Sequence, residues 1–150
     1  MAAPAEKESI LVVDDAPDTL EVLKRNLTSR GYRVFIAPGV VEAINILEST
    51  PVELVITDLK MPGVSGLDLV RHVRENLKDT EIMMITGYAT VEGAVEALKM
   101  GADEYLAKPF TEEELFSAVR QALNKLHLRK TNKSEARWTS SAFYGLLGES

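Results

Sequence analysis

The chain has 150 residues, 45% of them hydrophobic, which suffices for one well-cored domain with a short appendage but not comfortably for two domains. It contains no cysteine, so disulfides and thiolate-based zinc or redox sites are excluded. Residues 1–126 carry 13 basic against 21 acidic side chains, and this negative balance disfavours nucleic acid as a partner. The sequence has no apolar run of membrane-spanning length and no apolar core of a signal peptide, so we expect a cytoplasmic protein without membrane contact.

Five short apolar, β-branched runs follow an expected N-terminal tail at residues 1–8. They lie at 10–13, 34–37, 54–56, 82–85 and 105–107. Runs so short and so apolar are typical of strands that are buried on both faces. Between them apolar residues recur at helical spacing, as at Leu20, Leu23 and Leu27. The alternation predicts an α/β three-layer sandwich, in which helices cover both faces of a five-stranded parallel sheet.

The last predicted helix spans residues 112–126. Thr111 precedes three glutamates, which suit the positive end of a helix. After Leu126 the sequence becomes polar and basic with little periodicity, so residues 127–150 are expected to form a linker or a frayed helix end. A helix that continues as a coiled coil stays open as an alternative, although its apolar repeat extends over only about two heptads.

Polar side chains follow the predicted strands at their carboxyl ends. Asp14 and Asp15 close the first strand, Asp58 closes the third, Thr86 closes the fourth and Lys108 follows the fifth. In an open parallel sheet, ligands bind at these ends, where the strand order reverses. If the order is 2-1-3-4-5, the first and third strands are neighbours and their three carboxylates share one pocket.

A pocket with three carboxylates requires a cation. At a separation of about 5 Å and an effective dielectric near 20, each pair of carboxylates repels by about 3 kcal/mol. Lys108 supplies one positive charge, and an all-oxygen site suits Mg²⁺. Asp58 is then placed as a nucleophile, with Lys108 and Thr86 to contact phosphoryl oxygens. Aspartyl phosphate is the natural product of this set.

Four stretches carry a resemblance to a known family. The sequences LVVDDAPD, VITDLKMPGVSG, MMITGYA and GADEYLAKPF, in this order and spacing, resemble the receiver domain of two-component response regulators. The resemblance covers roughly residues 8 to 126 and places a receiver domain at 9–126. It implies a flavodoxin-like fold, with the strand order 2-1-3-4-5 carried over from the family. It also implies phosphorylation by a sensor histidine kinase, and no enzymatic activity beyond assisting that transfer and slow autodephosphorylation.

The same resemblance assigns the metal site. By it, Asp58 is the phosphoacceptor, and Asp15, Asp58 and the backbone carbonyl of Lys60 hold Mg²⁺, with Asp14 contributing through water. Lys60 and Tyr88, beside the site, are the positions expected to tune hydrolysis of the phosphate.

The resemblance also assigns a switch. Thr86 and Lys108 contact the phosphoryl group, the Lys108–Pro109 peptide is cis, and Tyr105 is an aromatic switch coupled to Thr86. The output is a changed surface on the fourth helix, the fifth strand and the fifth helix. Val119, Ala122 and Leu126 are expected to add apolar area to that surface, which would support a homodimer.

The final residues carry a second resemblance. YGLLGES, residues 144–150, is similar to the opening of the AAA+ ATPase module that follows the receiver in transcriptional activators of the σ54-dependent (NtrC) type. The chain would then be the regulatory part of an activator with downstream ATPase and DNA-binding modules. A flexible apolar tail is the alternative. No Gly-rich phosphate loop with lysine follows in the sequence, so ATP hydrolysis is not expected from these residues.

Three other functions are compatible with parts of the pattern. A Mg²⁺-dependent phosphatase of the haloacid-dehalogenase type also uses an aspartate nucleophile, but it places a second aspartate two residues later, where this chain has Lys60. A flavin-binding electron carrier needs a hydroxyl- and glycine-rich loop after the first strand, where this chain has DDAPDT. A stand-alone receiver that docks onto a partner differs from the favoured interpretation only after Leu126.

Overall fold

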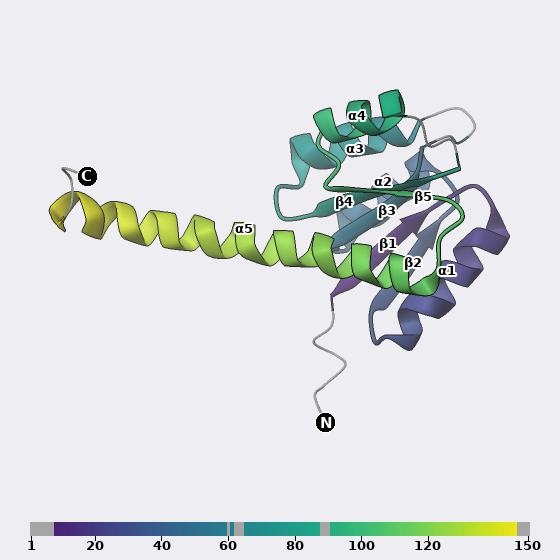
Figure 1. Cartoon of the computed structure of the whole chain (residues 1–150), viewed down its shortest axis with the longest axis horizontal. Coiled ribbons are helices and arrows are strands. Elements are labelled where there is room, and N and C mark those ends of the chain that lie inside the picture. The colour runs from purple at the N-terminus through teal and green to yellow at the C-terminus, as the bar shows by residue number, and fades with distance from the viewer. Residues whose placement is uncertain (1–7, 60, 62–64, 88–90, 147–150) are drawn as a thin grey trace.

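The computed structural model describes the backbone of residues 8–59, 61, 65–87 and 91–146, and the side chains of these residues except 91 and 130–146. Five strands alternate with five helices along this part of the chain (Figure 1). The elements are β1 (Ser9–Val13), α1 (Pro17–Ser29), β2 (Arg33–Ala37), α2 (Val40–Ser49), β3 (Leu54–Asp58), α3 (Gly66–Asn76), β4 (Glu81–Thr86), α4 (Val91–Lys99), β5 (Glu104–Ala107) and α5 (Glu112–Leu146).

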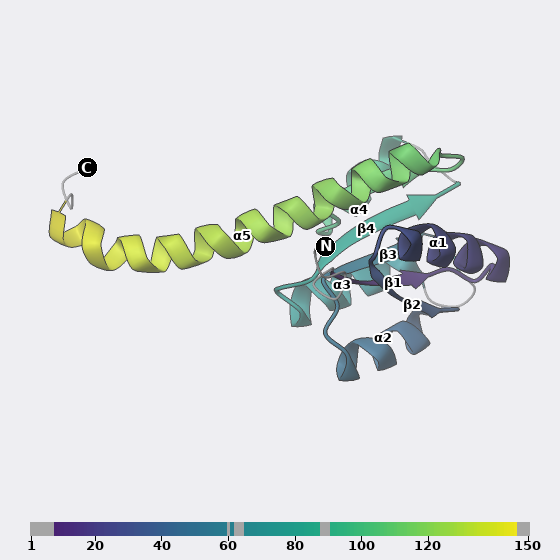
Figure 2. The same ribbon diagram turned by 90° about the horizontal axis from the view of Figure 1, so that it is seen from below.

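The strands form one parallel sheet in the order β2-β1-β3-β4-β5. Figures 1 and 2 show α1 and α5 on one face of the sheet and α2, α3 and α4 on the other. The predicted three-layer α/β sandwich and its strand order are therefore confirmed. Because β1 and β3 are neighbours, the residues that follow them meet at the carboxyl edge of the sheet.

Alternation along the central strands divides the core into two halves. Residues such as Ile10, Ile56 and Met83 pack with α1 and α5, whereas their neighbours in sequence, such as Leu11 and Val55, pack with α2, α3 and α4. Both sets are buried, which explains why β1, β3 and β4 are apolar without interruption. Each fully buried aliphatic side chain contributes about 1.5–3 kcal/mol relative to exposure.

Reciprocal side-chain caps fix the starts of α3 and α5. The Ser65 hydroxyl accepts a hydrogen bond from the backbone N–H of Leu67, and the Asp68 carboxylate accepts from the N–H of Ser65. At α5, the Thr111 hydroxyl accepts from the N–H of Glu114, whose carboxylate accepts from the N–H of Thr111. The start of α5 thus matches the prediction made from Thr111 and the glutamates.

The predicted end of the last helix near Leu126 is wrong, because α5 continues to Leu146. No proline and no glycine occurs between Leu126 and Gly145, and most of the residues there tolerate a solvated helix. The spacing of apolar residues indicates which part of α5 is buried, and it does not indicate where the helix ends. The division into domains at residue 126 stays a prediction, and residues 147–150 lie outside the described residues, as do 1–7 of the expected N-terminal tail.

The expectation that Val119, Ala122 and Leu126 enlarge an exposed surface is also wrong. All three side chains are buried, at 0%, 0% and 1% exposure. They cover the sheet face that α1 leaves open, because α5 is the second helix of that layer (Figure 2). In the part of the chain that the structure describes, no helix has the length and apolarity needed to cross a bilayer.

Candidate functional site

Three aspartates meet at the carboxyl edge of the sheet. Asp14 and Asp15 directly follow β1, and Asp58 is the last residue of β3. One carboxylate oxygen from each of the three lies within 4.8 Å of the others. The pairing of β1 with β3 brings them together across more than forty positions of sequence, as the strand-end argument predicts.

Asp14 and Asp15 have different surroundings. Asp14 is buried, and its Oδ1 accepts a hydrogen bond from the backbone N–H of Ala16 at 2.9 Å. Its Oδ2 accepts from Lys108 Nζ at 3.3 Å. Asp15 is exposed to solvent. Asp14 is therefore held in one orientation by the protein, whereas Asp15 presents its carboxylate at the mouth of the site.

Asp58 is held from two sides. Its side chain is only 12% exposed, and its Oδ2 lies 3.5 Å from Lys108 Nζ. Its Oδ1 accepts a hydrogen bond from the backbone N–H of Leu59 at 2.7 Å. Burial raises the pKa of the Asp58 carboxyl, the positive charge of Lys108 lowers it, and the neighbouring Asp14 raises it. The net pKa is above the usual value, since burial and a like charge outweigh the lysine.

The turn after β3 is supported by the start of α3. The backbone N–H of Gly66 donates to the carbonyl oxygen of Leu59 at 2.9 Å, and the Ser65 hydroxyl donates to the same oxygen at 3.3 Å. A Cβ atom on Gly66 would clash with the carbonyl oxygen of Asp58. Glycine at this position therefore allows α3 to approach the end of β3, a role that sequence reasoning did not separate from ordinary turn chemistry.

Thr86 and Tyr105 lie on the same face of adjacent strands. Tyr105 pairs with Met84 in the sheet register, and Thr86 follows Met84 by two residues, so both side chains point to the same side. Thr86 is fully buried, and its carbonyl oxygen accepts a hydrogen bond from the backbone N–H of Lys108 at 2.9 Å. The Tyr105 hydroxyl is buried without a hydrogen-bond partner among the described residues.

The structure tests only some of the remaining predictions about the site. The peptide bond between Lys108 and Pro109 is cis, as expected. Lys60 and Tyr88 lie outside the described residues, so the metal-ligand role of the Lys60 carbonyl and the tuning role of both positions stay predictions. The roles of Asp58, Thr86, Lys108 and Tyr105 also stay predictions.

The donor set fits a divalent cation. Three carboxylates face one lysine, which leaves an excess of negative charge at a site that reaches solvent through Asp15. All the candidate ligand atoms are oxygens, and hard cations such as Mg²⁺ prefer oxygen ligands and retain several waters. A cation here would reduce the repulsion among the carboxylates.

Comparison with known proteins places these features in a family. The family model described as the response regulator receiver domain matches residues 10–120. The acid tolerance regulatory protein ActR of Rhizobium meliloti (strain 1021) is 37% identical over 114 residues, which cover 76% of this chain and 59% of that protein. The chain thus spans somewhat more than half the length of this relative.

Two solved structures have the same fold as this chain. A CheY-like response regulator receiver domain protein from Methanospirillum hungatei JF-1 superposes with a TM-score of 0.78 at 30% identity, over 83% of this chain and 99% of that chain. NtrX from Brucella abortus, solved in complex with ADP, superposes with a TM-score of 0.81 at 26% identity. That match covers 85% of this chain and 29% of the NtrX chain.

Proposed function

Because this chain belongs to the response regulator receiver domain family, we propose that it accepts a phosphoryl group on Asp58 from a phosphohistidine of a sensor histidine kinase. Receiver domains are regulatory modules rather than enzymes. The observation that carries the proposal is the placement of Asp58: it ends β3 beside two further carboxylates, with Lys108 Nζ 3.5 Å from its Oδ2.

The transfer needs little from the protein beyond position and charge. A carboxylate oxygen of Asp58 forms the new O–P bond while the N–P bond of the phosphohistidine breaks. The imidazole leaves with the electron pair of that bond and takes a proton from water. Lys108, which already contacts Asp58, places its positive charge where the phosphoryl oxygens arrive. The hydrogen bond from Leu59 holds the carboxylate in orientation during the step.

A magnesium ion fits the same site. Asp15 and Asp58, with the carbonyl of Lys60, would hold it, and Asp14 would contribute through water. When bound, the ion supplies positive charge that offsets the charge of the phosphoryl oxygens. Lys108 helps to keep two of these carboxylates in place, because its Nζ lies 3.3 Å from Asp14 Oδ2 and 3.5 Å from Asp58 Oδ2.

The switch is proposed to act through Thr86 and Tyr105. The Thr86 side chain would turn toward the new phosphoryl oxygens, and Tyr105 would change its position on the same sheet face. The buried Tyr105 hydroxyl lacks a partner among the described residues, and such a group costs about 1–3 kcal/mol. An alternative position that satisfies this hydroxyl therefore competes, and phosphorylation would shift the balance between two existing states.

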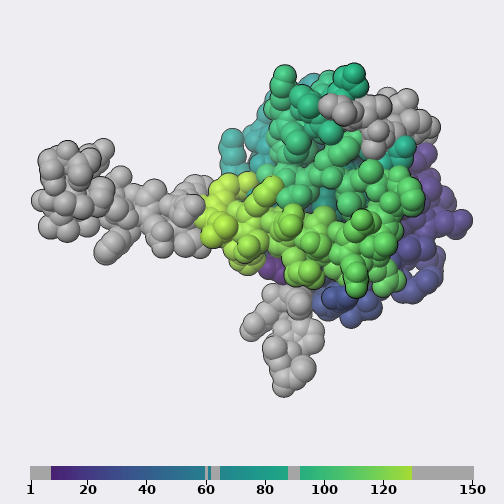
Figure 3. Space-filling model, viewed as in Figure 1, coloured from purple at the N-terminus to yellow at the C-terminus, as the bar shows by residue number. Residues whose placement is uncertain are grey.

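The output surface is proposed to be α4, β5 and α5, which Figure 3 shows as one continuous face. Two apolar side chains of α4, Val95 and Leu98, are 44% and 50% exposed. They replace the α5 residues expected from the sequence as the apolar part of a homodimer contact. The similarity to NtrX and the sequence YGLLGES support a σ54-dependent activator with a downstream AAA+ module, and a cytoplasmic location follows from that role.

Phosphorylation can be tested with a small donor. With acetyl phosphate and Mg²⁺, intact-mass measurement should show one added phosphoryl group, which hydroxylamine removes. Asp58→Asn should stay unmodified, whereas Asp79→Asn, an exposed aspartate in the turn before β4, should react like the parent. Equal labelling of the Asp58→Asn variant would overturn the assignment.

Assembly needs its own test. Solution X-ray scattering with and without beryllofluoride, which mimics the phosphoryl group, should show a dimer whose arrangement changes. Val95→Glu on α4 should weaken it by placing a charge in the contact, while Val41→Glu, on the exposed side of α2, should not. A monomer in both states would favour a stand-alone receiver.

A further inference from the structure

A second polar cluster lies at the opposite edge of the sheet from Asp58. It surrounds Glu81, the first residue of β4, which is 0% exposed. This is also the edge at which α5 leaves the domain, as Figures 1 and 2 show. Three basic residues of α5 at this point, Lys125, His127 and Arg129, each contact a different part of the domain; we refer to them as the collar.

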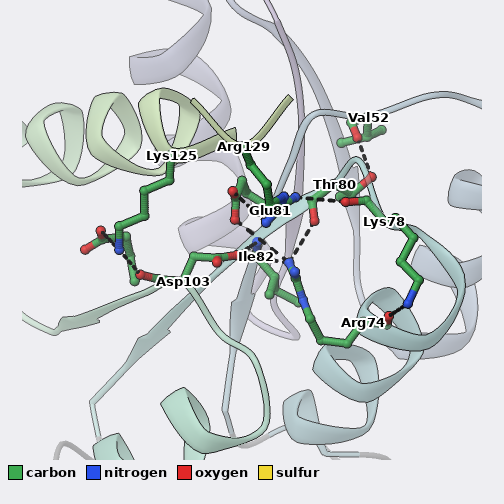
Figure 4. A network of polar contacts seen from close by, with 10 residues as sticks. Val52, Arg74, Lys78, Thr80, Glu81, Ile82, Asp103, Lys125 and Arg129 are labelled. Carbon is green, nitrogen blue, oxygen red and sulfur yellow. Dashed lines mark hydrogen bonds and ion pairs between the residues drawn. The ribbon is translucent and has the colours of Figure 1, made fainter. Parts of the chain in front are cut away.

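Arg129 makes the most buried contact of the collar. Its Nη1 lies 3.0 Å from Glu81 Oε2, and its Nη2 donates to the carbonyl oxygen of Lys78 at 2.9 Å. One guanidinium thus joins α5 to the first residue of β4 and to the turn before it (Figure 4). Planar guanidinium groups suit such two-point contacts, because their donors are fixed in one plane.

Arg74 does not replace Arg129 as a partner of Glu81. Its Nη2 lies 3.9 Å from Glu81 Oε1, but it donates to the carbonyl oxygen of Thr80 at 2.7 Å and to Asp103 Oδ2 at 2.9 Å. Arg129 is therefore the nearer cation to Glu81. Where Glu81 is ionised, above its pKa of about 8, loss of Arg129 would be strongly destabilising, because the charge of Glu81 would be left in a medium that solvates it poorly.

The two other collar residues hold α5 from different directions. Lys125 Nζ donates to the carbonyl oxygen of Asp103 at 2.6 Å and lies 2.8 Å from Glu104 Oε2, at the start of β5. His127 Nε2 lies 2.7 Å from Glu8 Oε2, just before β1. Exposed pairs of this kind contribute only about 0–1 kcal/mol each. Their value here is directional, because Lys125 contacts the start of β5 and His127 the residue before β1, and these two strands lie on opposite sides of β4 in the sheet.

We propose that the collar fixes the direction in which α5 leaves the domain, so that the helix beyond Arg129 is a rigid lever rather than a freely swinging rod. The apolar packing of α5 ends before the point at which the helix leaves the domain. The last buried apolar residue of α5 is Leu126, and Leu128 is 55% exposed. Beyond Leu126, the described contacts between α5 and the body are those of His127 and Arg129.

The proposal can be tested by spin labelling, because the chain contains no cysteine. Nitroxides on Glu48→Cys, an exposed position of α2, and Ser134→Cys, within α5, report the orientation of the lever by double electron–electron resonance. The measurement is made without phosphodonor or Mg²⁺, so that its outcome does not depend on Asp58. A pH of about 9 keeps Glu81 ionised, since its pKa is raised to about 8.

The doubly labelled parent should give one narrow distance distribution. Adding Arg129→Gln and Lys125→Gln should broaden it at least about twofold. Arg120→Gln is the matched control, because this exposed arginine of α5 forms no ion pair with any described residue. It should leave the distribution unchanged.

Two further readouts keep the test decisive. If Arg129→Gln does not fold because Glu81 is stranded, the double variant Arg129→Gln, Glu81→Gln removes both charges and should still broaden the distribution. Circular dichroism should show that α5 keeps its helicity, which separates swinging from unravelling. A distribution as narrow as that of the parent in folded collar variants, or broadening explained by loss of helix, would overturn the proposal.

Discussion

The pH dependence of stability should be dominated by Glu81. Burial is the largest cause that raises the pKa of this carboxyl from 4.5 to about 8, and Asp103 raises it further through a hydrogen bond and its charge. Arg129 and Arg74 act in the opposite direction. The folded protein therefore keeps a proton that the unfolded chain releases at lower pH.

The sign and size of the effect follow from that difference. Because the folded state binds more protons, the free energy of unfolding falls as pH rises from about 4.5 to about 8, and the contribution is complete only below the lower value. At 1.36 kcal/mol for each pKa unit, the full loss is about 5 kcal/mol, of which about 3 has occurred by pH 7. These are upper figures, since the arginines adjust as the carboxyl ionises.

Glu81→Gln tests this directly. The amide stays neutral at every pH and keeps the shape of the protonated carboxyl, so the variant should be more stable than the parent by about 1–3 kcal/mol at pH 7. Urea unfolding followed by circular dichroism at intervals between pH 5 and 9 gives the difference curve, in which the other titrating groups cancel. Glu75→Gln, an exposed glutamate of α3, is the matched control and should follow the parent.

The outcome that refutes the reasoning is specific. If Glu81→Gln is less stable than the parent and shows the same slope between pH 5 and 8, then Glu81 is ionised in the folded protein and the arginines outweigh its burial. A variant that is more stable but keeps the parent slope would assign the gain to packing instead.

Three other changes probe the carboxyl edge. Asp15→Ala should weaken Mg²⁺ binding in a calorimetric titration by about tenfold or more, because one of three carboxylates is lost; unchanged affinity would contradict its role as a ligand. Thr86→Ala should reduce the phosphorylation-dependent NMR shifts around Tyr105, and full shifts would show that the two residues are not coupled. Gly66→Ala should cost about 1–3 kcal/mol in urea unfolding, because its Cβ meets backbone, whereas Gly87→Ala, with open space around it, should change stability by less than about 0.5 kcal/mol.

The sequence was most informative where physical constraints act locally. Strands buried on both faces must be apolar throughout, so β1, β3 and β4 are recognisable from short runs alone. A parallel sheet collects the ends of its strands at one edge, which brings Asp14, Asp15 and Asp58 together once the order of strands is assumed. That order came from the family resemblance, and periodicity alone does not supply it.

The errors arose where one pattern carries two meanings. The apolar spacing of α5 reports burial, and it stops at Leu126 although the helix does not. The same spacing made Val119 and Ala122 candidates for an exposed surface, but their exposure depends on which sheet face the helix covers. Glu81 gave no signal, because an acidic residue before a strand is usually solvated. Its burial depends on partners from α3, α5 and the turn before β5.

The two edges of the sheet are joined by β4 and β5. β4 begins at Glu81, beside the collar, and ends at Thr86, whose carbonyl oxygen holds the backbone of Lys108 at the Asp58 edge. β5 begins at Glu104, which contacts Lys125, and its next residue is Tyr105. If phosphorylation moves Tyr105 as proposed, the displacement arises one residue from a contact that sets the direction of α5. β4 and β5 are thus a contiguous, hydrogen-bonded connection between the site and the lever, and contiguous packed elements of this kind are what can carry coupling between two sites.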